Sequence, residues 1–445
     1  MLEQYEPTSE TAWNASRVVH LHRRAGFAAT WNEIQRDLSD GPAAAVTRLL
    51  HNSPTGQQTD AGEVTSDFEQ MSSVICDAAV GSGNINRLKA WWLYRMLFTP
   101  DPLGERLTLM WHNHFATSNV KVADVSLMRR QNELFRKFAR APFGDLLHRA
   151  ANDPALLIWL DADANRKEHP NENLAREIME LFSLGVGNYT EDDVQQAARA
   201  LTGWSVNKGK FRNYDQYHDD GEKTIFGQRG NWTGEGFVRM LAEHPATSRR
   251  IAFRICEQFL GETLSSPDIV DELASGLRER TLDVGWAVET VVRSKTFFSA
   301  GNIRNRVLSP IEFVVGAVRS LEIMDPPPST LLLAEATANL GQDIFNPPNV
   351  FGWPGGRAWL TNRALIGRAN FALALVNGEL HTPSKPFDAA ALAASNGFTE
   401  AGEIGSFFAQ LLLGQEELPN ELRQYLETPN RLVTAILASP EAQLA

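Results

Sequence analysis

Apolar residues recur along most of the chain at intervals of three and four, the spacing that places them on one face of an α-helix. The series Leu103, Leu107, Met110 and Trp111 is typical. The pattern predicts a mainly α fold, a multi-helix globular array. The expected helices span residues 12–24, 31–38, 42–50, 84–98, 103–114, 126–139, 143–152, 173–184, 190–202, 234–243, 247–260, 266–279, 284–293, 310–321, 329–340 and 361–375, and two more close the chain.

The helical pattern is interrupted in a few places. Residues 208–227 carry aromatic side chains and an Asp220-Gly221 dipeptide, which favours a tight turn, so we expect a small β-hairpin insertion there. Residues 51–64 are polar with Gly, Pro and Ser, and predict a surface loop; the Pro and Gly residues of 346–356 exclude regular structure. The predicted organisation is a helical domain over 1–380 and a C-terminal helical extension over 381–445, packed on the same body.

The charge balance bears on whether the protein binds nucleic acids. The chain has 42 basic and 54 acidic side chains, a formal net charge of −12, and its arginine clusters are short. A protein that neutralises many phosphates carries a basic excess or a basic stripe, so we do not expect nucleic-acid binding.

Cysteine usage limits the chemistry further. Only Cys76 and Cys256 are present, far apart in the sequence, which excludes a thiolate zinc site or a disulfide scaffold. One long-range disulfide stays open beside the favoured interpretation, two buried free thiols.

The N-terminus has no basic region followed by an apolar run, and no stretch approaches the roughly 20 apolar residues of a spanning helix. As written, the chain is expected to be soluble and cytoplasmic. If a leader has been removed, it is expected to be periplasmic or exported.

Residues 169–185, HPNENLAREIMELFSLG, read as a helix with an unusual polar side. At about 100° per residue, Asn173, Glu177 and Glu180 fall on one arc, separate from the apolar stripe. A solvated acidic face is the ordinary fate of such glutamates. The alternative is that the two carboxylates face a functional site.

The stretch WHNHF places His112 and His114 two positions apart. Both rings could bind one metal ion if the backbone were extended, because alternate side chains of a strand share a face. If the helix persists, the rings diverge by about 200° and cannot share an ion. In that case His114 faces inward as a hydrogen-bonded core residue.

Two loops offer weaker signals. His218, Asp219 and Asp220 could bind a divalent ion or transfer a proton, although the sequence favours an Asx turn. The stretch DADAN, residues 161–165, resembles the start of a calcium loop, but Arg166 stands where such a loop requires Gly, so calcium is discounted. The alternatives are that this loop caps a helix or holds Arg166 near the carboxylates.

Seven stretches are distinctive: HLHRRAGFAAT, ERLTLMWHNHFATSNVKV, MRRQNELFRKFA, DPALLIWLDADANRKEHPNENLAREIMELFSLGVGNYTEDDVQQAARALTGW, HDDGEKTIFGQRGNW, SPIEFVVGAVRSL and FNPPNVFGWPGGRAWL. In this order they resemble the bacterial domain-of-unknown-function 1800 family, from about Val18 to Asn370. The resemblance implies no settled activity. It does imply frequent export and a sulfatase-like secreted companion, and it favours an inward position for Glu177 and Glu180. The polar residues of these signatures are His112, His114, Asn171, Glu172, Asn173, Glu177, Glu180, His218, Asp219 and Asp220.

Two functions follow as hypotheses, and whether the protein is an enzyme stays open between them. The first is a metal-assisted hydrolase or transferase acting on an envelope or extracytoplasmic substrate. The second is a non-catalytic helical partner or scaffold of a sulfatase-like neighbour, in which the same polar residues form a buried network around residues 346–356. In the first, a divalent metal ion is held by His112, His114, Glu177 and Glu180, protons are transferred by His218 and Asp219, and binding involves Asn171, Asn173, Arg166 and Asp220.

Overall fold

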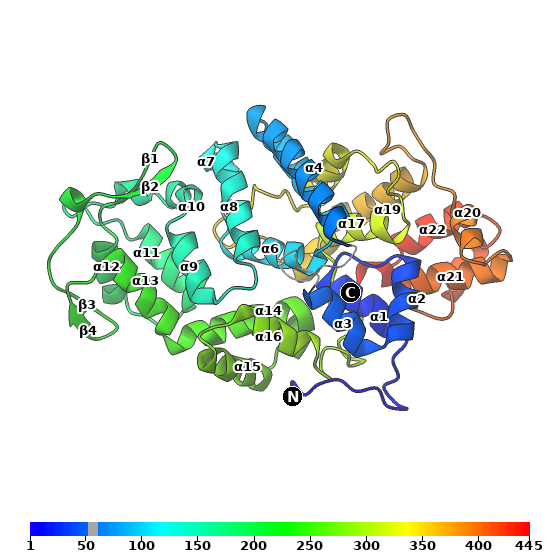
Figure 1. The fold of residues 1–445 in the computed structure, drawn as a ribbon, viewed down its shortest axis with the longest axis horizontal. Helices are drawn as coiled ribbons and strands as arrows, with labels where there is room; N and C mark the ends of the chain where they lie inside the picture. Colours follow the sequence, from blue (N-terminus) through cyan, green and yellow to red (C-terminus); the bar gives the residue numbers. More distant parts are fainter. Residues whose placement is uncertain (52–60) are drawn as a thin grey trace.

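Helices dominate the fold, as the periodicity predicts. The protein is described here from a computed structural model that covers residues 1–51 and 61–445 (Figure 1). Most of the predicted loop over 51–64 therefore lies outside the described residues. The N-terminal helices are α1 (Ala15–Ala25), α2 (Trp31–Asp40), α3 (Pro42–His51), α4 (Ala61–Gly81), α5 (Ile85–Phe98), α6 (Pro102–His114), α7 (Asn119–Val122), α8 (Val125–Lys137), α9 (Phe143–Ala151) and α10 (Pro154–Trp159).

The central helices follow the predicted segments closely, except that the acidic segment changes its helical type, and three helices rather than the predicted two close the chain. There α11 (Asn173–Glu177) continues as a π-helix, η2 (Ile178–Ser183). The remaining helices are α12 (Glu191–Ala200), α13 (Gly234–Glu243), α14 (Pro245–Leu264), α15 (Pro267–Glu279), α16 (Val284–Val292), α17 (Pro310–Ser320), α18 (Thr330–Asn339), α19 (Asn362–Val376), α20 (Ala389–Ser395), α21 (Ala401–Leu413) and α22 (Pro429–Ala438); short 3₁₀ turns include η4 (Gly356–Leu360).

The β insertion consists of two hairpins. Strands β1 (Trp204–Asn207) and β2 (Lys210–Asn213) pair antiparallel, as do β3 (Lys223–Ile225) and β4 (Gln228–Gly230). The mainly α fold with a small β insertion is thus confirmed.

The position of the hairpin turn differs from the prediction. The turns lie at Lys208-Gly209 and Phe226-Gly227, whose residues all have positive φ, as type I′ turns require. The Asp220-Gly221 dipeptide instead precedes β3.

Buried apolar side chains form two clusters, which we call the first core and the second core. The first core gathers around α9 and α11 to α16, and the second around α5 and α17 to α22. Helices α9 and α11 to α16, cyan to green, and helices α17 to α22, yellow to red, occupy opposite halves of the molecule, with α6 between them (Figure 1). Helix α6 contributes Leu107 and Trp111 to the first core and Leu109 to the second.

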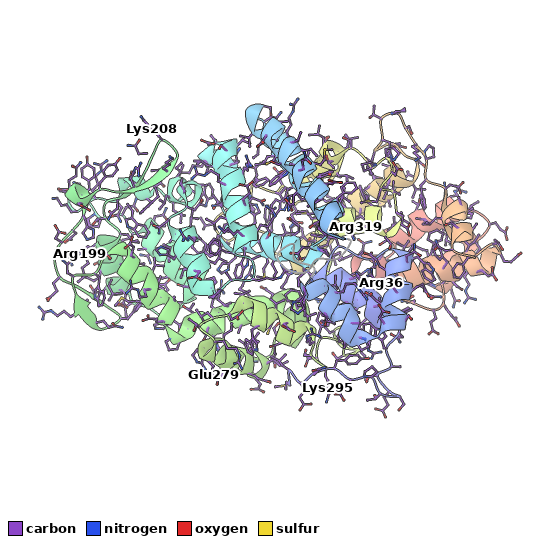
Figure 2. All side chains as sticks on the ribbon, in the orientation of Figure 1. Arg36, Arg199, Lys208, Glu279, Lys295 and Arg319 are labelled. Carbon is purple, nitrogen blue, oxygen red and sulfur yellow. The ribbon has the colours of Figure 1, made fainter. Side chains whose placement is uncertain are left out.

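Side chains fill the space between the ribbons in both halves, whereas Lys208 and Glu279 lie at the periphery (Figure 2). Cys76 and Cys256 are buried free thiols, so the favoured interpretation is confirmed and the disulfide alternative is wrong. Among the described residues, no helix has both the length and the apolar character needed to cross a bilayer.

Candidate functional site

The two histidines of WHNHF lie on α6, which stays helical through His114. Their rings therefore point to different neighbours. The Nε2 atom of His112 accepts a hydrogen bond from the backbone N–H of Phe345 at 3.1 Å. The Nε2 atom of His114 donates to the carbonyl of Phe182 at 3.0 Å. Both imidazoles are buried and engaged with backbone groups, whereas the helical alternative places only His114 inward.

Burial also fixes the charge of these rings. Desolvation lowers the pKa of His112 to about 3. It lowers the pKa of His114 well below the ordinary value, with a further contribution from Arg254 and Arg250. Both rings are neutral at neutral pH, and His112 carries its proton on Nδ1, because its Nε2 accepts a hydrogen bond.

Replacing His112 by glutamine is expected to flatten the acid dependence of stability. The unfolded ring binds a proton below about pH 6.5 and the folded ring only near pH 3, so the wild type loses stability as the pH falls through this range. Between pH 6.5 and 4.5 the loss from this one group is about 2 kcal/mol. Urea denaturation of wild type and His112→Gln across pH 4.5–7.5 measures it; parallel curves would contradict the assignment.

The predicted acidic face is half-buried rather than solvated. Glu180 accepts a hydrogen bond from the hydroxyl of Tyr189 at 2.6 Å. Burial, and then the neighbouring Glu180, raises the pKa of Glu177. The π-helical turn brings the hydroxyl of Ser183 to the carbonyl of Ile178, at 2.6 Å.

The predicted binding residues hold the preceding loop. Asn165 accepts from the N–H of Asn171 at 2.9 Å, Asn171 accepts from the N–H of Asn173 at 2.9 Å, and Asn173 donates to the carbonyl of Leu160 at 3.1 Å. Arg166 lies 4.2 Å over the ring of Tyr217, so its neighbour is this ring. Glu172 pairs with Arg176 at 2.9 Å. The side chain of Asp163 lies outside the described residues.

His218 and Asp219 hold a turn against α12. His218 Nδ1 bonds to the carbonyl of Thr202 at 2.9 Å. Asp219 accepts from Arg199 Nε at 2.7 Å and from the N–H of Gly221 at 2.8 Å, which is the Asx turn that the sequence favours. Asp220 is exposed.

The structure does not assemble the predicted metal centre. Within residues 1–51 and 61–445, no three or more His, Cys, Asp or Glu side chains are grouped so that they could hold a metal ion. His112, His114 and Glu180 each have a different neighbour, namely Phe345, Phe182 and Tyr189. The physical reason is the unbroken helix α6, which turns the two imidazoles apart.

A cavity of about 310 Å³ lies elsewhere, between α6, α14, α17 and residues 353–359. We call it the arginine pocket. Its lining has an excess of cations, although the whole chain carries a formal charge of −12. The charged lining residues are Arg106, Arg254, Arg306, Arg357, Glu257 and Glu312.

Glu312 is the buried counter-ion of the pocket. It lies in the first turn of α17, in a capping box with Ser309, whose N–H donates to it at 2.7 Å. Arg106 Nη1 forms an ion pair with Glu312, and Arg306 Nη2 donates to it at 2.7 Å. Burial would raise the pKa of this carboxyl, but Arg106 and Arg306 outweigh it and bring the pKa to about 2. Glu312 is therefore ionised.

The single carboxylate of Glu312 does not neutralise all of the buried arginines around it. Arg106 is 1% exposed, and its Nε and Nη2 atoms have no hydrogen-bond partner in the described part of the chain. Behind it, the fully buried Arg24 donates to the carbonyl of Asn302 at 3.1 Å, whereas its Nε and Nη1 are unpaired among the described residues. Burial, and then the charge of Arg306, lowers the pKa of Arg24. Buried cations without full compensation are costly, and a bound anion would compensate them.

Helix α6 also positions one wall of the pocket. Asn113 accepts from the N–H of Trp353 at 2.8 Å and donates to its carbonyl at 3.4 Å. Gly352 makes this close approach feasible, because it has a φ of 78° and a Cβ atom there would lie 2.1 Å from Asn113 Oδ1. Trp353 and Trp359, both buried, line the cavity. His112 and Asn113 thus hold residues 345–353 in place.

Arg106, Arg306 and Glu312 are not among the site residues that the sequence predicts. A signal was present, because four of the seven distinctive stretches meet at or directly behind this pocket. They contribute Arg24, Arg106 and Glu312, and the wall that contains Trp353. The residues predicted from the sequence are histidines, asparagines, acidic residues and Arg166, and none of them lines this pocket.

Comparison with known proteins gives one match. The family model described as "Protein of unknown function (DUF1800)" matches residues 20–444, nearly the whole chain. No curated protein and no solved structure matches.

Proposed function

Since the chain belongs to the DUF1800 family, whose function is unknown, its activity must be argued from its own residues, and we propose that the arginine pocket binds a small anionic ligand. The observation that carries the proposal is Arg106, a fully buried cation that lines the cavity with two unpaired nitrogen atoms. Guanidinium groups bind carboxylates, phosphates and sulfates through two parallel hydrogen bonds.

The surroundings of Arg106 support an anion rather than a cation. Of the two glutamates in the lining, Glu257 is paired with Arg254 at 2.6 Å and Glu312 is shared by two arginines. This leaves a positive excess in a partly desolvated cavity, where electrostatic attraction is stronger than in water. The volume of about 310 Å³ is near the lower end for small-molecule sites, so the ligand is small.

Anion binding also suits the second hypothesis, a non-catalytic partner protein. The side chains of His112 and Asn113 hold backbone groups of residues 345–353, which lead into the pocket wall, and His114 holds the carbonyl of Phe182, as expected of a structural network. The metal-assisted hydrolase or transferase gains no support from the positions of its proposed ligands. The envelope substrate, the export and the sulfatase-like companion stay predictions from the family resemblance.

Anion titration tests the proposal. Phosphate, sulfate and acetate are titrated into the protein at low ionic strength, with calorimetry and thermal unfolding as readouts. We expect saturable binding of at least one of them, with a stabilisation of about 2.7 kcal/mol at 100 times Kd. Arg106→Gln is expected to weaken that binding by about 10-fold or more, because it removes a charge-assisted contact.

Arg368→Gln is the matched control. Arg368 is 1% exposed, like Arg106, but it donates to Gln443 at 2.8 Å and to the carbonyl of Leu308 at 2.6 Å, outside the pocket lining. This variant is expected to lose stability and keep the wild-type affinity. Absence of saturable binding in the wild type, or equal weakening in both variants, would refute an anion site at Arg106.

A further inference from the structure

The uncharged residues that line the arginine pocket indicate which class of ligand it binds. We propose that the pocket takes an anionic monosaccharide, a single sugar ring that carries a carboxylate, phosphate or sulfate group. This inference rests on the anion binding proposed above. It adds a second requirement, a ring with one apolar face and several hydroxyl groups.

The apolar requirement comes from two indoles. Trp353 and Trp359 both line the cavity, and each is 6% exposed. The backbone N–H and carbonyl of Trp353 are held by Asn113, which places this residue in the wall before any ligand arrives. A rigid aromatic side chain offers a large apolar contact at a low entropic cost. The C–H face of a sugar ring matches such a surface.

The hydroxyl requirement comes from carboxamides. Gln258 on α14 is half-buried in the lining, and neither of its amide atoms is hydrogen-bonded to another described residue. Gln342 also lines the pocket; its Oε1 accepts from the N–H of Ile311 at 3.0 Å. A carboxamide offers a donor and an acceptor side by side, which suits a pair of neighbouring hydroxyl groups. An inorganic anion would leave the free amide of Gln258 and the indoles without a ligand contact.

Size separates this class from larger anions that also carry rings. A cavity of about 310 Å³ is close to the lower limit of ligand sites, which favours one sugar ring with its acidic group. A nucleotide needs space for a base, a ribose and a phosphate together. The indoles, the amides and the buried guanidinium therefore fit a single charged sugar best.

Paired titrations test the class of ligand. The affinity for glucose 6-phosphate is compared with the affinities for inorganic phosphate and for glucose, and that for glucuronate with that for acetate. Adenosine monophosphate is titrated as a larger anion that also carries rings. We expect at least one charged sugar to bind about 10-fold or more tightly than its bare anion, and glucose to bind weakly. Gln258→Ala is expected to remove most of that advantage while the affinity for inorganic phosphate stays unchanged.

Gln415→Ala serves as the control, because Gln415 is also half-buried but lies outside the lining. It is expected to bind both ligands like the wild type. Inorganic phosphate binding that depends on Arg106, with no gain from the sugar, would overturn this inference and leave the anion site standing. Tighter binding of adenosine monophosphate than of both charged sugars would also overturn it. No binding of any anion would refute both proposals.

Discussion

Replacing Glu105 with glutamine is expected to lower the free energy of unfolding by about 3–5 kcal/mol, the usual cost of removing one partner from a buried ion pair. Glu105 is 2% exposed. It accepts hydrogen bonds from Trp92 Nε1 at 2.9 Å, from Arg95 Nε at 2.9 Å and from Arg136 Nε at 2.6 Å. The substitution keeps the shape of the side chain but leaves two largely buried guanidinium groups without their shared charge. Urea denaturation at pH 7.5 measures the loss.

Glu133→Gln is the control for this change. Glu133 forms a partly exposed ion pair with Arg129 at 2.9 Å, and such pairs contribute less than about 1 kcal/mol. Burial would raise the pKa of Glu105, but Arg136 and Arg95 outweigh it and lower the pKa to about 2. The folded pKa is below the unfolded value of about 4.3, so this stabilisation is present above pH 4.3 and is lost as the pH falls toward 2. Similar losses in Glu105→Gln and Glu133→Gln would show that the buried network is not formed.

The second large effect is expected at the wall of the pocket. Gly352→Ala should destabilise the protein by about 3 kcal/mol, because a side chain at positive φ is strained and its Cβ would lie 2.1 Å from Asn113 Oδ1. Trp353 must then shift away from α6 and open the pocket wall to water, which weakens the electrostatic attraction at Arg106, so anion affinity should fall together with stability. Thermal unfolding and phosphate titration of the same samples measure both losses.

Gly397→Ala isolates the backbone part of this effect. Gly397 has a φ of 89°, close to that of Gly352, and a Cβ there would meet nothing within 4 Å. It should lose only about 1 kcal/mol and keep its anion affinity. If Gly352→Ala behaved like Gly397→Ala, the close contact between Asn113 and the pocket wall would not exist in solution.

The sequence predicts the helices well because local patterns decide where helices form. The spacing of Leu103, Leu107 and Trp111 defines α6, and Pro102 with the Asp101 cap marks its start, with Asp101 accepting from the N–H of Gly104 at 2.9 Å. The π-helical turn of η2 has no comparable local signature. The sequence predicts the hairpin turn at Asp220-Gly221 because this dipeptide has the composition of a type I′ turn, but in the structure the segment forms an Asx turn with Asp219.

The site could not be located from local patterns alone. The arginine pocket joins α6, α14, α17 and residues 353–359, and their meeting depends on packing between distant parts of the chain. Arg106 looks like an ordinary surface residue in the sequence, because arginine is seldom fully buried. His112 and His114 look like ligands, but the helix directs them to backbone partners. The helical alternative for WHNHF predicted this divergence correctly.

The continuous helix α6, shared by the first and second cores, has a consequence for how a ligand is received. When the two halves of a binding protein are joined only by loops, they must close around the ligand. The free-energy cost of that closure weakens the observed affinity. Here one rigid helix carries Arg106 and Asn113 and is packed into both halves at once. We therefore expect the proposed binding site to be preorganised, without a hinge motion to assemble it.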